Sequence, residues 1–410
     1  MSQKFWSLVF LALFVAYVFG YMLPSIFVDF KQIAFVREKL YEDAVILHGS
    51  NYKRAGFYAL ESLNLSIFLA FYRFILFGFW VVFGFVWLQK FISLNLDLHI
   101  QSALFIICFL ISNQILLLPV NFYKKVYLDR KFGFGNVSIW LFIQDEIKTA
   151  SIFFVTGFIC GYALSFLALN FSFWWIYVSI FCAVILICIN MIYPCIIAPY
   201  FNKKSPLKNR HLNNRINNLI KNIGSSASGI YTMDTGRKDG LLNAYFGGIF
   251  SQKRIILFEA LLNSKISNDG ILAIIGHELG HLKYKDLLKK TLVLSFIAFS
   301  LFLAMDILVP HVLYGIYLDL YMGQILAFVM LLSSAIIFWG RCFFGYFSRS
   351  YEYRADRFGA SLTGNFYLAD ALLRIVHSED FPHFHPIYTF FYHIHPPLLD
   401  RLRALGYEHQ

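Results

Sequence analysis

The hydrophobic positions of this chain are gathered into long uninterrupted runs. A run of about 20 apolar residues is long enough to cross a bilayer as a helix. The first run follows Lys4 and could be a signal peptide, but it is long and no A-x-A-like cleavage site ends it, so a retained span is favoured. The pattern predicts seven spans: Trp6–Ile26, Leu65–Leu88, Ala103–Phe122, Ser151–Phe171, Phe173–Cys195, Leu292–Tyr314 and Met322–Phe347.

Composition supports a membrane protein built mainly from α-helices. Of the 410 residues, 59% are hydrophobic and only 14% are charged, and the mean hydropathy is +0.61. The six cysteines all lie in apolar segments and form no C-x-x-C pair, so they are interpreted as buried apolar side chains.

The formal net charge of +11 is distributed asymmetrically. If the chain crosses the membrane seven times, four of its connecting segments lie on one side. These are Asp29–Asn64, Tyr123–Ala150, Pro199–Lys290 and Ser348–Gln410, which hold 5, 5, 15 and 6 Lys or Arg residues. By the positive-inside rule that side is cytoplasmic, and the N-terminus faces the lumen or periplasm. The basic charge therefore predicts membrane orientation, and no nucleic-acid partner.

The chain is predicted to divide into residues 1–198 with five spans, a catalytic segment 199–290, spans six and seven in 291–347, and a C-terminal catalytic segment 348–410. Residues 31–61 could form an amphipathic helical hairpin. A basic, Asn-rich stretch through Asn222 is predicted to be a solvated helix. Within 199–290, we predict a small β-sheet from strands at Gly229–Met233, Asn243–Phe246 and Arg254–Phe258, followed by a helix at Ile271–His281 with N-cap groups at Ser267–Asp269.

The helix Ile271–His281 ends in the HExxH pattern His277-Glu278-Leu279-Gly280-His281. Residues four apart share one helix face, so His277 and His281 can bind one Zn²⁺. Glu278 lies beside the open metal position, where it can act as a general base on a water. A surface helix with two His and one Glu is the alternative, but the preceding residues are apolar or Gly, and a buried Glu with two His needs a partner.

A catalytic zinc usually has three protein ligands. The best candidate for the third is Glu352, which follows the seventh predicted span and lies on the same side as HELGH. Asp356 is four residues further and shares its helical face, so it could accept a hydrogen bond from a ligand histidine. Spacing alone leaves open that both are solvated carboxylates on a charged helix.

In the order of its motifs the sequence resembles the Ste24-type CAAX prenyl proteases, the integral membrane branch of the M48 zinc metalloproteases. The matching segments are Ala198–Lys203, Asn243–Phe246 (NAYF), His277–His281 (HELGH), Glu352–Asp356 (EYRAD) and His395–Leu402 (HPPLLDRL). The resemblance covers most of the chain and implies seven transmembrane helices enclosing a water-filled chamber, with a gluzincin-like zinc domain. It departs before Asn243, where no His is present, which leaves the finer substrate contacts open.

The resemblance also implies roles for individual residues. Glu352 would be the third zinc ligand, and Asp356 an acid behind the ligands that is sometimes assigned as a proton donor. Asn243, Ala244 and Tyr245 would form an edge strand that binds substrate backbone. His395 and Arg401 would stabilise the developing oxyanion, although His395 could instead be a packing residue before the Pro-Pro turn.

These inferences together predict an endopeptidase with one Zn²⁺ per chain, acting on a membrane-associated peptide or protein, possibly C-terminally prenylated. We expect it in a bacterial inner membrane or the endoplasmic reticulum, in contact with lipid and plausibly monomeric. The polar residues within the spans could face a chamber or form interhelical hydrogen bonds: Arg73, Asn113, Gln114, Asn190, Asp306 and Arg341.

Three other functions are compatible with parts of the sequence. An HtpX-like quality-control protease would fit four spans better than seven. A site-2-type intramembrane protease would place HELGH inside a span, whereas here it precedes one. A non-catalytic, lipid-binding scaffold with a structural zinc would have no use for the general base Glu278.

Overall fold

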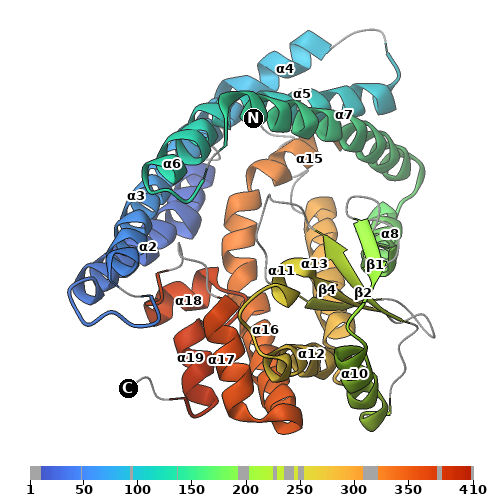
Figure 1. Cartoon of the computed structure of the whole chain (residues 1–410). Coiled ribbons are helices and arrows are strands. Elements are labelled where there is room, and N and C mark those ends of the chain that lie inside the picture. The colour runs from blue at the N-terminus through green and yellow to red at the C-terminus, as the bar shows by residue number, and fades with distance from the viewer. Residues whose placement is uncertain are drawn as a thin grey trace. The chain divides into compact units, whose positions relative to one another are not determined.

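The structure is a computed structural model that describes residues 11–47, 49–92, 96–135, 137–192, 203–224, 229–234, 244–247, 254–307, 322–375 and 381–407. Two compact units are formed. The first comprises residues 1–181, 296–342 and 378–392, and the second comprises 182–295, 343–377 and 393–410. Each unit is therefore assembled from segments that are far apart in the sequence (Figure 1).

The first unit is helical. It contains helices η1 (Val18–Met22), α2 (Leu23–Lys39), α3 (Ser50–Phe79), η2 (Trp80–Gly84), α4 (Phe85–Ile92), α5 (Leu98–Phe122), η3 (Tyr123–Leu128), α6 (Asp129–Lys131), α7 (Ile139–Asn170), α15 (Met322–Leu331) and α18 (Pro386–Tyr392), and α8 (Trp174–Ile192) begins in it. Several π-helical turns (η) interrupt these helices without ending them. Helices α5 and α7 pack closely because Gly161 allows the backbone of Ala103 to approach.

Within the described residues, five helical stretches are long and apolar enough to cross a membrane: Leu11–Lys39, Ser50–Ile92, Leu98–Lys131, Ile139–Asn170 and Asp286–Ile307. The pair α15 and α16 (Ser333–Thr363) passes the same criterion together, with a bend of 58° between them, and α8 is a shorter apolar helix. The chain is thus a multi-pass membrane protein, while the count of seven spans stays a prediction. The hairpin predicted at 31–61 is helical, but its arms are continuations of the spans.

Polar residues in these spans bond between helices. Arg73 Nη1 donates to Tyr21 Oη at 3.1 Å. Gln114 Nε2 donates to Glu146 Oε2 at 2.7 Å, and Trp174 Nε1 donates to Asp306 Oδ1 at 2.6 Å. For Arg73, Gln114 and Asp306 the structure favours the interhelical interpretation, because each has a partner from another helix.

The second unit contains a four-stranded sheet in the order β1-β2-β4-β3. Its strands are β1 (Lys203–Pro206), β2 (Gly229–Asp234), β3 (Ala244–Gly247) and β4 (Arg254–Phe258). Strands β2 and β4 are parallel, and the outer strands β1 and β3 pair antiparallel with them. All three predicted strands are confirmed within the described residues, and β1 is an addition that the sequence pattern did not indicate.

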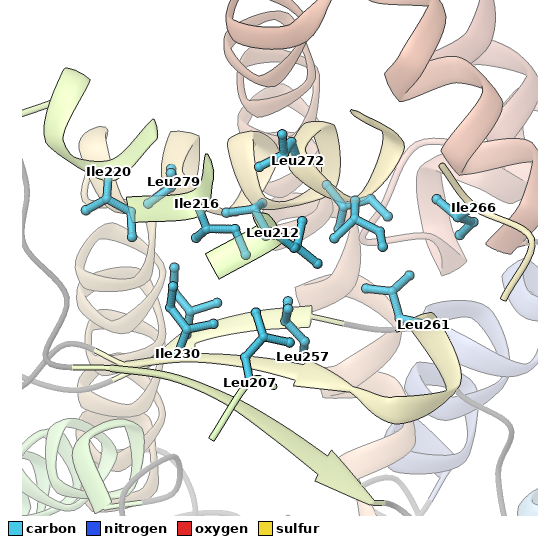
Figure 2. Close-up of a cluster of buried hydrophobic side chains, with 14 of the residues drawn as sticks. Leu207, Leu212, Ile216, Ile220, Ile230, Leu257, Leu261, Ile266, Leu272 and Leu279 are labelled. Atoms are coloured by element: carbon cyan, nitrogen blue, oxygen red, sulfur yellow. The ribbon is translucent and has the colours of Figure 1, made fainter. Parts of the chain in front are cut away.

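Helices α10 (Arg210–Asn222) and α12 (Asn268–Lys283) cover one face of this sheet. The remaining helices of the unit are α11 (Glu259–Leu262), α17 (Asn365–Ile375) and α19 (Leu398–Ala404), with the C-terminal part of α16 and the first part of α13 (Asp286–Ile307). Figure 2 shows side chains of α10 and α12 pointing toward Ile230 and Leu257 of the sheet.

Helix α10 was predicted to be solvated, but one of its faces is buried. Leu212, Ile216 and Ile220 recur every four residues and lie in the core, while the polar residues between them face outward. Helix α12 begins where the sequence indicates, since Ser267 Oγ accepts a hydrogen bond from the amide of Gly270 at 3.1 Å. Its burial against the sheet fixes the helix that carries HELGH.

Candidate metal centre

The two helices that carry the HELGH and EYRAD motifs pack through small residues. A Cβ added at Gly276 of α12 would lie 3.1 Å from the Cα of Gly359 on α16, and one added at Gly280 would lie 3.0 Å from the Cα of Ala355. A Cβ at Gly359 would lie 2.7 Å from the backbone nitrogen of His277. Because the backbones approach this closely, the side chain of Glu352 can reach the HELGH helix.

Three donor atoms converge at this contact, from His277, His281 and Glu352. The two Nε2 atoms of the histidines are 3.2 Å apart. One carboxylate oxygen of Glu352 lies 3.4 Å from Nε2 of His277, and the other lies 3.4 Å from Nε2 of His281. A tetrahedral Zn²⁺ with bonds of about 2.0–2.1 Å would place its ligands about 3.3–3.4 Å apart, so this donor set fits such an ion.

Each histidine is backed by a carboxylate on its other ring nitrogen. Nδ1 of His277 lies 2.8 Å from Asp356 Oδ1, and Nδ1 of His281 lies 3.0 Å from Asp286 Oδ2. Asp356 and Asp286 are both almost fully buried. Such partners fix the ring orientation and the tautomer that leaves Nε2 free to bind a metal.

Each of these carboxylates is in turn held by an arginine. Arg401 donates to both oxygens of Asp356, from Nε at 2.8 Å and from Nη2 at 2.6 Å. Arg354 donates to Asp286, and its guanidinium stacks over the rings of Tyr284 and Tyr351, 4.3 Å and 4.9 Å from their centroids. The ligand histidines are thereby supported by two parallel acid–arginine pairs.

The electrostatics of the site favour a cation at its centre. Burial acts to lower the pKa of His277, but the nearby carboxylates of Asp356 and Glu352 outweigh it and raise the pKa to about 9. Burial acts to raise the pKa of Glu352, and the histidines beside it hold that pKa well below its ordinary value. A buried carboxylate that is this strongly held in its charged form suits a metal ligand.

The remaining predicted residues are placed as follows. Burial raises the pKa of Glu278, which lies between the two histidines in sequence, despite the opposing effect of His277 and His281. Nδ1 of His395 lies 3.2 Å from Glu352 Oε1, with 58% of its side chain exposed. The guanidinium of Arg401 is bound to the carboxylate of Asp356.

Asn243 lies outside the described residues. Ala244 and Tyr245 belong to β3, which is an edge strand of the sheet, pairs with β4 and contacts α12. An edge strand offers unpaired backbone groups to an extended peptide. The position of β3 is therefore compatible with the predicted substrate strand, whose role stays a prediction.

Two residues of the site were missed from the sequence, Asp286 and Arg354. Asp286 follows His281 by five residues, and an acid just before an apolar helix could have been considered as a partner for the second ligand. Arg354 gave no signal, because its role depends on Asp286 and Tyr284, which are about 70 residues away in the sequence.

Comparison with known proteins agrees with this geometry. A family model for peptidase family M48 matches residues 206–409, and one for the CAAX prenyl protease N-terminal region, with five membrane helices, matches residues 43–203. A CAAX prenyl protease 1 homolog of Dictyostelium discoideum is 30% identical over 305 residues, which cover 69% of this chain and 68% of that protein. The chain belongs to peptidase family M48. It is therefore a metalloprotease.

Further relatives of this M48 protease are similar over comparable lengths. CAAX prenyl protease 1 of Saccharomyces cerevisiae is 29% identical over 312 residues, with 71% of this chain and 68% of that one covered. A homolog from Caenorhabditis elegans is 25% identical over 427 residues, covering 93% and 95%. The crystal structure of Ste24p from S. mikatae matches the fold with a TM-score of 0.83 at 23% identity, covering 98% of this chain and 99% of that one.

Asp286 holds the imidazole of His281, the second predicted ligand. An Asp286→Asn variant of this M48 protease should keep its fold but bind the metal about 10- to 100-fold more weakly, because His281 loses the acceptor that orients it. Competition with a calibrated chelator measures this affinity. Asp370→Asn is a matched control, since Asp370 pairs with Arg374 on the same helix, α17, and is not one of the converging donors. An unchanged metal affinity in Asp286→Asn would show that the carboxylate does not support the ligand.

Proposed function

We propose that this protein is a zinc-dependent endopeptidase that cleaves near the C-terminus of membrane-associated substrates of the CAAX, prenylated type. The observation that carries the metal assignment is the 3.2–3.4 Å separation of the three donor atoms from His277, His281 and Glu352. The substrate class is supported by the relatives named CAAX prenyl protease 1 and by the matching five-helix N-terminal region.

Zinc bound to these ligands, one ion per chain, supplies a Lewis acid that polarises the scissile carbonyl and lowers the pKa of a water. The carboxylate of Glu278 accepts a proton from the attacking water and then gives it to the nitrogen of the leaving amine. The raised pKa of Glu278 suits this task, because a weakly basic carboxylate of ordinary pKa would hold the proton poorly.

The surrounding residues position the metal ligands and the substrate and stabilise the charge that develops during attack. Asp356 and Asp286 orient the ligand imidazoles, and Arg401 fixes Asp356 through two hydrogen bonds. The imidazole of His395 is more than half exposed beside Glu352, and we assign it to stabilise the oxygen that becomes negatively charged during attack. Strand β3 would hold the substrate backbone in extended form, with Asn243 at its start.

The positive-inside rule and the family resemblance support an inner membrane or endoplasmic reticulum location, with the zinc site on the cytoplasmic side. A CAAX substrate, whose lipid anchors it to that face, would meet the site there.

The test compares matched prenylated and unprenylated peptides with purified protein, with and without a chelator. We expect cleavage of the prenylated peptide with a clear preference in kcat/KM, and loss of all cleavage with the chelator. Equal kcat/KM on both peptides would contradict the CAAX assignment while leaving the protease intact. Chelator-resistant cleavage would contradict the metal mechanism itself.

A further inference from the structure

The segment that leads to His395 is held against α16 at His393. Arg349 Nη1 donates a hydrogen bond of 2.5 Å to the carbonyl oxygen of His393. A Cβ added at Gly345 would lie only 2.9 Å from that same oxygen, which is closer than a side-chain carbon can normally come. The His393 backbone therefore reaches α16 because Gly345 has no side chain, and Arg349 then binds it.

These contacts share a helix face with the metal site. Gly345, Arg349, Glu352 and Asp356 follow one another at intervals of four, three and four residues, which places them along one side of α16. His395 Nδ1 meets Glu352 on that same side. The short segment from His393 to His395 is thus fixed at both ends by neighbouring turns of one helix.

His395 needs such support because most of its side chain lies in solvent rather than in the core. More than half of the side chain is exposed, and the residue lies in a non-helical stretch between α18 and α19. A displacement of about 1 Å in a catalytic group can cost about 10²-fold in rate. The His393 carbonyl, two residues before His395, is a backbone position that a side chain of α16 holds by a hydrogen bond.

We propose that Arg349 is a positioning residue for His395. It binds the His393 backbone, which can approach α16 because Gly345 has no side chain. In this role Arg349 would act on His395 through the hydrogen bond to the His393 carbonyl. The proposal rests on the proposed role of His395 in catalysis. Arg349 and Gly345 would thus contribute to catalysis although they lie outside the HELGH, EYRAD and HPPLLDRL motifs.

The first test is a double-mutant cycle on peptide cleavage with Arg349→Met, His395→Ala and the pair. Arg349→Met keeps a long side chain without the donor and should lower kcat by about 10-fold or more, with KM within about 2-fold. Arg349→Lys should restore part of the loss. In the His395→Ala background, Arg349→Met should cost nothing further, because the group that it positions is gone.

The outcomes distinguish the positioning role of Arg349 from the catalytic role of His395. Additive losses in Arg349→Met and His395→Ala, or a wild-type kcat in Arg349→Met, would overturn the positioning role while His395 keeps its own. A wild-type kcat in His395→Ala would instead overturn the role of His395 and the positioning of it together. Failure of the wild-type protein to cleave any peptide would concern the proposed function alone. Arg357→Met, an exposed arginine on the same helix, controls for loss of charge.

Gly345→Ala tests the same contact without removing a functional group, and Gly340→Ala is its matched control. Both glycines lie in α16, but a Cβ at Gly340 meets nothing within 4 Å. A Cβ at Gly345 would lie 2.8 Å from Arg349 Nη1 and 2.9 Å from the His393 oxygen. Both changes favour the helix equally, so their difference reports on the Arg349–His393 contact as a whole. We expect Gly345→Ala to reproduce the kcat loss of Arg349→Met and Gly340→Ala to match wild type. Equal behaviour of the two glycine variants would overturn the proposal.

A binding measurement complements the rates. A phosphinic peptide mimics the charged oxygens of the transition state, so its affinity should fall about 10-fold in Arg349→Met and in Gly345→Ala. Metal affinity, measured by chelator competition, and Tm should stay at wild-type values in both. A parallel loss of metal affinity would show that Arg349 supports Glu352 rather than His395, and would overturn the proposal.

Discussion

Peptide cleavage by a Glu278→Gln variant is expected to fall by about 10³- to 10⁴-fold, with zinc content and Tm unchanged. Gln keeps the shape of the side chain and removes the base that accepts the proton of the attacking water. Glu278 is not one of the three converging donors, so the metal should remain. Initial rates on a fluorogenic peptide and zinc analysis of the same preparation measure both quantities.

Glu259→Gln provides the control for this change. Glu259 begins the short helix α11 in the same unit but is not part of the donor cluster. It should cleave at the wild-type rate. If Glu278→Gln retained cleavage within about 10-fold of wild type while holding zinc, another group would have to be the base.

The second large effect is expected for Glu352→Gln, which should lose the metal itself. Its carboxylate supplies one of the three donors. The side chain is only 3% exposed, so a water molecule cannot easily take its place as a ligand. Metal affinity should fall by more than the about 10- to 100-fold that follows from removing an outer partner. Zinc analysis after dialysis against a weak chelator should find the variant depleted and inactive.

Thermal unfolding gives an independent readout of the same variant. A ligand that binds only the folded state raises stability in proportion to the logarithm of its concentration over Kd. The Tm of the wild-type protein should therefore fall on chelation, whereas the Tm of Glu352→Gln should not respond. A chelator-sensitive Tm in the variant, with zinc still bound, would remove Glu352 from the ligand set.

How far the sequence could predict this site depends on the type of signal. Long apolar runs and the HELGH spacing are local patterns, and they predicted the membrane helices and two of the donors directly. Glu352 was a candidate because it lies on the same predicted side as HELGH, and the resemblance of the EYRAD segment to that of a known family then implied its role as a ligand. Its approach to HELGH depends on Gly276, Gly280 and Gly359, whose pairing no local pattern indicates.

The supporting residues were harder to predict for the same physical reason. Asp286 and Arg354 are ordinary charged residues in sequence, and they acquire their roles through a buried contact between segments 68 residues apart. The helix α10 was misjudged because three apolar positions among many Asn and basic residues were outweighed by overall polarity. Their four-residue spacing was the better guide to burial.

The division of the metal centre between α12 and α16 has a consequence for synthesis of the protein. A ribosome completes His277 and His281 well before Glu352, and α13 and α15 must be inserted into the membrane in between. His395 and Arg401 emerge later still. A nascent or truncated chain that ends before α16 holds only two of the three donors, so we expect it to bind zinc weakly and to show no hydrolysis. The order of the chain would then delay assembly of the metal site until α16 has been made.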